Sequence, residues 1–175
     1  LGYFCLQLPA MQAAPNQPMP SREAGLDDIR GFRQLNPFAL PGDQDGRPTW
    51  NNLLADLREV LLRARPDVIV LPHPTLDPHP DHLCSQQAVL QVLSSLDWQP
   101  TLLGYANHLH DNDRWPMGNA GEGIALPPAF DGAAPMQPLC LPLTIEQQRD
   151  KAMALGMMHD LQPPAPFKRR LRRVI

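Results

Sequence analysis

The chain has 175 residues, 43% of them hydrophobic, which is enough to bury one ordinary core. Its net charge is −3, and five of its 15 basic residues lie together in "KRRLRR" (168–173). The rest of the chain holds 10 basic and 18 acidic residues. This balance excludes a broad basic surface and argues against nucleic acid as the main partner.

No apolar run approaches the roughly 18–20 residues that a bilayer-spanning helix requires. The cysteines, Cys5, Cys84 and Cys140, are odd in number and far apart, which argues against a disulfide framework and favours a reducing cytoplasm. The sequence begins at Leu1, inside an apolar run and without an initiator Met. We therefore interpret the chain as a piece of a longer protein.

The first 48 residues predict little regular structure. Residues 1–8 are apolar and predict a buried strand, whereas residues 9–48 contain many Pro and Gly turn clusters and predict loops. Helical spacing of apolar residues starts at Trp50, and Thr49 is a suitable N-cap for that helix.

Strands and helices then alternate with short links. Residues 67–71 contain a short continuous apolar run rich in β-branched residues, as in a strand that is covered on both faces. Residues 80–96 predict a second helix that begins with a proline, and residues 101–106 predict a second strand. This order is typical of crossovers in a parallel sheet. The expected fold class is therefore α/β, with a mostly parallel sheet in which the first of these strands is central.

The C-terminal part predicts one clear helix. Residues 107–143 predict loops, and residues 144–162 predict a helix that starts with the capping-box pair Thr144 and Gln147. Residues 163–175 predict a basic helix or tail. We expect this tail to be solvated, and attachment to an anionic membrane near lipid-linked sugars is the alternative.

Ionisable side chains concentrate in "DPHPDH" (77–82), which leads from the 67–71 strand into the next helix. In open α/β sheets, ligands bind beyond the carboxyl ends of the strands, and this segment lies at such an end. Two prolines restrict its backbone. His79 and His82 are three residues apart, so we expect them on one face of the first helical turn. The pair suits two metal ligands, or one ligand beside an acid–base group.

Asp81 lies between the two histidines, and it could orient an imidazole by accepting its second N–H. The alternative is that Asp77 and Asp81 cap the helix and that the histidines are solvated loop residues. The prolines and the position at a strand end favour the functional interpretation.

The segment "HPDH" (79–82), with the acidic Asp77 upstream, resembles the second motif of the PIG-L (LmbE-like) family of zinc-dependent N-acetyl deacetylases. In addition, "KAMALGMMHDLQ" (151–162) resembles the late helix of that family, and "LGYFCLQLPAMQ" (1–12) resembles its second strand. The resemblance covers residues 1–162. It implies a Rossmann-like three-layer fold whose N-terminal strand–helix unit is missing from this chain.

The resemblance also implies a role for each residue of the motif. His82 would be a zinc ligand, His79 would stabilise or protonate the reaction intermediate, and Asp81 would tune His79. The family's first motif, His-Pro-Asp-Asp, supplies the other ligands and the general base. It is absent from this sequence, and we expect it upstream of residue 1. The implied reaction is hydrolysis of an N-acetyl group from an amino sugar or related conjugate, and we expect this isolated piece to be inactive.

Substrate contacts are expected at the same edge of the sheet. Asp77 in the motif, and Asn107 and His108 after the 101–106 strand, are candidate substrate-binding residues, with solvated loop positions as the alternative for the last two. His159 lies on the apolar stripe of the late helix and is expected to be a core histidine.

Two other functions remain open. The first is a non-catalytic sugar-binding or interaction domain that kept the fold and lacks the first metal motif. The second is a different metallohydrolase that uses His73, Asp77, His79 and His82 together, although the prolines among them restrict how these side chains converge.

Overall fold

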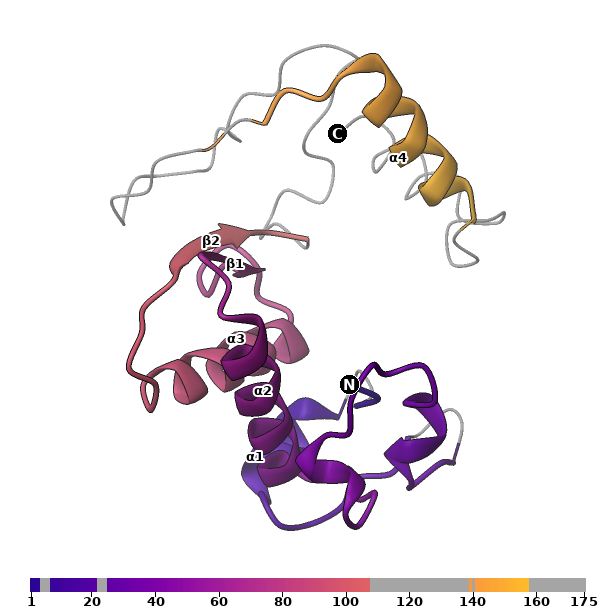
Figure 1. The fold of residues 1–175 in the computed structure, drawn as a ribbon, viewed down its shortest axis with the longest axis vertical. Coiled ribbons are helices and arrows are strands. Elements are labelled where there is room, and N and C mark those ends of the chain that lie inside the picture. Colours follow the sequence, from indigo (N-terminus) through magenta and orange to yellow (C-terminus); the bar gives the residue numbers. More distant parts are fainter. Residues whose placement is uncertain (4–6, 22–24, 108–138, 140, 158–175) are drawn as a thin grey trace. The chain divides into compact units, whose positions relative to one another are not determined.

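The structure is a computed structural model that describes residues 1–3, 7–21, 25–107, 139 and 141–157. In chain order its elements are α1 (Leu8–Ala13), η1 (Ile29–Phe32), η2 (Pro41–Asp43), α2 (Trp50–Ala64), β1 (Val68–Pro72), α3 (Pro80–Leu93), β2 (Thr101–Tyr105) and α4 (Ile145–Met157), where η marks a 3₁₀ helix (Figure 1). The chain divides into two compact units, Leu1–His110 and Asp111–Ile175, which are described separately.

The described residues among 1–8 do not form the expected strand. Residues 1–3 and Gln7 lie outside regular elements, and α1 begins at Leu8. The loop expectation for residues 9–48 missed this helix, because a six-residue helix is too short to show periodicity and depends on tertiary packing. The packing is provided by Met11, which is fully buried in a cluster with residues of α2 and α3. The buried members of that cluster are Met11, Trp50, Leu53, Cys84 and Ala88.

Helix α2 confirms both the predicted helix and its cap. Thr49 Oγ1 accepts a hydrogen bond from the backbone N–H of Asn52 at 3.1 Å. The helix ends at Ala64, its C-cap residue Arg65 has a left-handed φ of 38°, and Pro66 follows. This end is expected, because the residue before a proline disfavours the helical conformation. The apolar stripe of α2 therefore stops at this cap, and its residues pack against α1 and α3.

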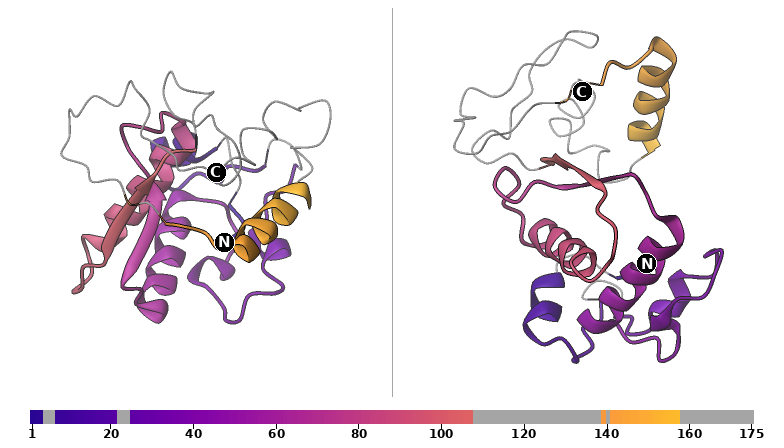
Figure 2. Two further views of the ribbon diagram at one scale, coloured as in Figure 1. Left: turned by 90° about the horizontal axis from the view of Figure 1, so that it is seen from above. Right: turned by 60° about the vertical axis from the view of Figure 1, so that its left-hand side comes forward.

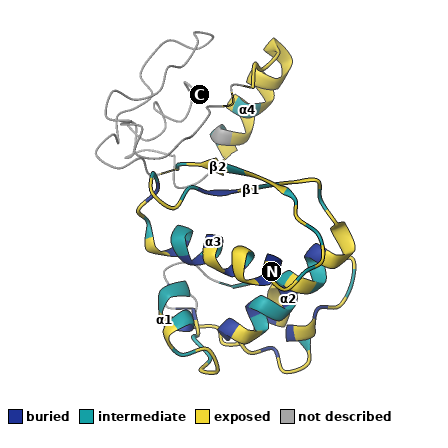
Figure 3. Ribbon diagram, turned by 90° about the vertical axis from the view of Figure 1, so that its left-hand side faces the viewer, coloured by how far each residue is buried: buried dark blue, intermediate teal, exposed yellow. Residues whose placement is uncertain are grey.

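Strands β1 and β2 pair in parallel, which confirms the predicted crossover through α3. Ile69 lies opposite Leu102, and Leu71 lies opposite Gly104. Both α2 and α3 lie on the same side of this sheet, and Figure 2 shows the arrangement from two further directions (Figures 1–3). On that side Ile69 packs against a cluster of buried apolar residues from the two helices, namely Leu61, Val92 and Leu93.

The opposite face of the sheet is more open. Val68 and Val70 are 47% and 63% exposed. Leu71, which belongs to the face towards the helices, is 5% exposed. Within the described residues, β1 is therefore covered on one face only, and the prediction of a strand covered on both faces is wrong. The described residues also do not show the predicted central position of strand 67–71, because their sheet contains only β1 and β2. The α/β class with parallel pairing is confirmed, and the three-layer fold stays a prediction.

In the second unit, α4 confirms the predicted capping box. The backbone N–H of Thr144 donates to Gln147 Oε1 at 2.9 Å, and the backbone N–H of Gln147 donates to Thr144 Oγ1 at 3.2 Å. His159 and the expected boundary at residue 162, together with the basic tail 163–175, lie outside the described residues. Within the described ranges, no helix is long and apolar enough to cross a membrane.

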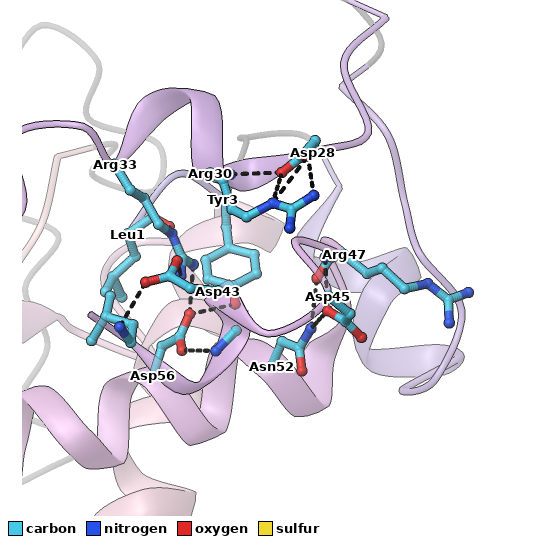
Figure 4. Close-up of polar contacts among 12 residues, drawn as sticks. Leu1, Tyr3, Asp28, Arg30, Arg33, Asp43, Asp45, Arg47, Asn52 and Asp56 are labelled. Carbon is cyan, nitrogen blue, oxygen red and sulfur yellow. Dashed lines mark hydrogen bonds and ion pairs between the residues drawn. The ribbon is translucent and has the colours of Figure 1, made fainter.

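A buried ion pair joins the segment before α2 to that helix. Arg33 Nη2 lies 2.5 Å from Asp56 Oδ2, and Arg33 Nη1 lies 2.9 Å from Asp43 Oδ1 (Figure 4). The Tyr3 hydroxyl donates to Asp56 Oδ2 at 2.7 Å, and the Gly42 N–H donates to Asp56 Oδ1 at 2.6 Å. Burial, together with the Asp56 carboxylate, raises the pKa of Tyr3 well above its ordinary value, so the hydroxyl remains a donor.

The packing around Asp56 is also sterically tight. A Cβ atom on residue 42 would lie 2.7 Å from Asp56 Oδ2, so this position requires glycine. Arg33 Nε donates to the carbonyl oxygen of Leu1 at 2.7 Å, which ties the first residues into the same network. The network therefore joins the first residues and the segment around Arg33 and Gly42 to α2.

We expect Asp56→Asn to lower the free energy of unfolding by about 3–5 kcal/mol, because the change leaves the buried guanidinium of Arg33 without its closest carboxylate. Urea denaturation measures this difference. Asp97→Asn is the control, since the Asp97 side chain is 84% exposed and lies 3.9 Å from its cation, and its effect should stay within about 0.5 kcal/mol. Equal stability of the two variants would contradict the structural role of the buried pair.

Candidate functional site

The two histidines of the motif lie together where β1 leads into α3. His79 is the N-cap residue of α3, and His82 lies in the first turn. Their ring centroids are 4.6 Å apart, and the ring planes are tilted by 37°. The spacing of three residues thus places both imidazoles side by side, as predicted.

The His82 imidazole is oriented by a buried carboxylate. Its Nδ1 lies 2.8 Å from Asp77 Oδ2. The Asp77 side chain is fully buried, and the His82 side chain is 23% exposed. An ionised carboxylate is a pure acceptor, so this contact favours the tautomer with the shared hydrogen on Nδ1. In the neutral ring, Nε2 then carries the lone pair that a metal or a proton would use.

His79 has the opposite arrangement. Its Nδ1 accepts a hydrogen bond from the backbone N–H of Asp81 at 3.3 Å. A backbone N–H can only donate, so Nδ1 is unprotonated and the hydrogen of the neutral ring lies on Nε2. The two adjacent imidazoles therefore present different groups, an N–H donor at His79 Nε2 and a lone pair at His82 Nε2.

Asp81 is buried, and its carboxylate has a partner that the sequence did not indicate. Asp81 Oδ1 accepts a hydrogen bond from the backbone N–H of Leu8 at 3.2 Å, at the start of α1. The two residues are 73 positions apart, so no local pattern predicts the contact. The carboxylate that holds an imidazole at 2.8 Å is Asp77. A role for Asp81 in tuning His79 stays a prediction.

Asp77 also connects the motif to the end of β2. The backbone N–H of Asn107 donates to Asp77 Oδ2 at 2.8 Å, and the backbone N–H of His79 donates to Asp77 Oδ1 at 3.3 Å. Asp77 and Asn107 were both predicted to bind substrate, and the structure brings them together. His108, the third residue of that prediction, lies outside the described residues.

His73 is held by the turn that precedes the motif. Its Nδ1 accepts from the backbone N–H groups of Thr75 at 3.2 Å and Leu76 at 3.3 Å. Its own backbone N–H donates to the carbonyl oxygen of Tyr105 at 2.7 Å. Across the described part of the chain, no three His, Cys, Asp or Glu residues are grouped to hold a metal ion. The structure thus gives no support to a metal set that includes His73 with Asp77 and the two motif histidines.

Comparisons of the chain with protein-family models, with curated proteins and with solved structures found no match. The resemblance to the PIG-L deacetylases therefore depends on the motif residues alone.

The backbone of β2 sets the position of the His73 ring. A Cβ atom on residue 104 would lie 2.9 Å from His73 Cδ2, so Gly104→Ala must displace the imidazole. We expect a loss of about 1–3 kcal/mol in the free energy of unfolding, as for other overpacked sites, together with altered His73 ring signals in NMR spectra. Gly31→Ala is the control, because its Cβ would meet no atom within 4 Å. Unchanged His73 signals in Gly104→Ala would contradict this packing.

Proposed function

We propose that the chain is part of a zinc-dependent N-acetyl deacetylase that acts on an amino sugar or a related conjugate. One observation supports this proposal above the others. At the carboxyl end of β1, His82 offers an imidazole lone pair directly beside the N–H donor of His79, with 4.6 Å between ring centroids. Hydrolysis of an amide at a metal uses this combination of a ligand and a neighbouring hydrogen-bond donor.

The donor set of His82 fits zinc at one ligand position. Zinc-bound histidines usually donate their second ring N–H to a carboxylate, which fixes the ring orientation, and the Asp77–His82 contact has this form. A catalytic zinc site needs three protein ligands and an open position for water. The proposal therefore takes the remaining ligands from outside the described residues. When bound, zinc would polarise the acetamide carbonyl and lower the pKa of a water molecule towards neutrality.

The chain's own residues would serve the reaction in distinct ways. His79 Nε2–H would donate to the carbonyl oxygen as negative charge develops there, and the general base expected outside the described residues would pass the water's proton to the departing amine. The hydrogen bond from the backbone of Asp81 keeps the His79 hydrogen on Nε2. Asp77 keeps His82 in the orientation that presents Nε2. A cytoplasmic location and a small-molecule or lipid-linked N-acetyl sugar substrate belong to the same proposal.

We expect replacement of the two histidines to have different results. In the gene product as the cell makes it, His82→Ala should lose zinc and activity together. His79→Ala should keep stoichiometric zinc but lower kcat by about 10²–10³, with little change in KM, because it removes a donor to the developing charge. Zinc content is measured by elemental analysis, and activity by acetate release from an N-acetylglucosamine conjugate. His73→Ala is the matched control and should keep both.

Other outcomes would contradict specific parts of the proposal. If His79→Ala arrives without zinc, both histidines are ligands and the donor role of His79 is wrong. If the unmodified protein binds the conjugate and releases no acetate, the non-catalytic sugar-binding function is correct instead.

The present chain should bind zinc weakly, since one histidine cannot complete a zinc shell. Tight one-to-one binding by this chain would show that its own residues supply the full set.

A further inference from the structure

The Asp77 carboxylate accepts three hydrogen bonds that come from two segments of the chain. It accepts from the His82 side chain in α3, from the backbone of His79 at the start of that helix, and from the backbone of Asn107 after β2. The last contact and the His82 contact use the same oxygen, Oδ2, and both are 2.8 Å long. One atom therefore links the position of the chain after β2 to the orientation of the His82 ring.

This environment is unsuited to direct substrate contact. The Asp77 side chain is fully buried, and both of its oxygens accept hydrogen bonds from the protein. A buried carboxylate is stable only when donors replace its lost water, and these donors fill that requirement. A sugar hydroxyl would have to displace one of them. The earlier assignment of Asp77 to substrate binding is therefore less consistent with the structure than a role inside the protein.

We propose that Asp77 is a positioning residue that sets the His82 tautomer and fastens the exit of β2 beside the histidine pair. The relevance of this role to catalysis rests on the proposed deacetylase function, whereas the role itself concerns hydrogen bonds of the chain alone. Because both Asp77 oxygens accept from backbone N–H groups, the carboxylate acts as an acceptor towards His82 as well, which places the His82 hydrogen on Nδ1 and the lone pair on Nε2. Because Asn107 shares Oδ2, the second residue after β2 is held at the same carboxylate.

The substitution Asp77→Asn tests the role with almost no change in shape. An amide has one accepting oxygen and one donating nitrogen, so it cannot accept from His82, Asn107 and His79 at once. If its oxygen takes the Oδ1 position, its NH₂ group faces two donors. If its oxygen takes the Oδ2 position, the NH₂ group faces the backbone N–H of His79. In either orientation the amide lacks the charge that holds the hydrogen on His82 Nδ1.

The measurement is nitrogen-15 NMR of the imidazoles in the zinc-free chain, at a pH where the rings are neutral. The unmodified chain should show His82 with its hydrogen on Nδ1, and Asp77→Asn should show a large population with the hydrogen on Nε2. Exchange of the Asn107 amide hydrogen with solvent should become about 10- to 100-fold faster in the variant, because it loses a hydrogen bond to a charged acceptor. In the zinc-loaded gene product, zinc affinity should fall about 10- to 100-fold.

Asp56→Asn is the matched control. Asp56 is also fully buried and accepts from a backbone N–H and from side chains, but its partners are Tyr3, Arg33 and Gly42. It should lose stability while keeping the His82 tautomer and the exchange rate of the Asn107 amide. If Asp56→Asn also changed the His82 tautomer, the effect of Asp77→Asn would come from general destabilisation. That result would overturn the proposal.

The unmodified chain alone can overturn the proposal, even if Asp77→Asn fails to fold. A His82 hydrogen on Nε2 in the unmodified chain would contradict it directly. The proposal would also be contradicted if Asp77→Asn had the same His82 tautomer and the same Asn107 exchange rate as the unmodified chain. Neither readout involves catalysis. If both change as expected and the gene product neither holds zinc nor releases acetate, the positioning role stands and the deacetylase function falls.

Discussion

The hydrogen bond between Asp77 and His82 is the interaction on which the site depends. His82 Nδ1 lies 2.8 Å from an oxygen of the fully buried carboxylate, and our proposal assigns the ring hydrogen to that nitrogen. That assignment gives His82 a lone pair on the nitrogen where a metal would bind. The adjacent His79, whose Nδ1 accepts from a backbone N–H, is left with a donor. The chemical difference between two identical residue types therefore comes from their partners.

The fold holds this pair in place from two sides. Strand β1 delivers the motif at its carboxyl end, and the parallel strand β2 brings Asn107 to the same edge, where its backbone contacts Asp77. From the other side, Asp81 accepts from the start of α1 and so links that helix to the first turn of α3. The first helix is packed in turn against α2, which the buried Arg33–Asp56 pair joins to the preceding segment.

Local signals predicted the regular elements from α2 onward, and they could not predict the contacts between them. Thr49 and Thr144 begin helices through hydrogen bonds that span three residues, so the sequence carries the whole signal. The positions of His79 and His82 side by side also follow from a local signal, because the two residues are three positions apart. The Tyr3–Asp56 and Leu8–Asp81 hydrogen bonds join residues 53 and 73 positions apart, and they follow from tertiary packing alone. Helix α1 was missed for the same reason, since its stability comes from its neighbours.

The central claim is that His82 binds zinc through Nε2 while His79 stays outside the metal shell. Anomalous diffraction at the zinc edge, on crystals of the gene product grown with zinc, tests this claim most directly. We expect a zinc peak within bonding distance of His82 Nε2, with the Asp77 carboxylate still hydrogen-bonded to His82 Nδ1 and with His79 uncoordinated. A zinc ion on His79, or a zinc site that does not include His82, would contradict it.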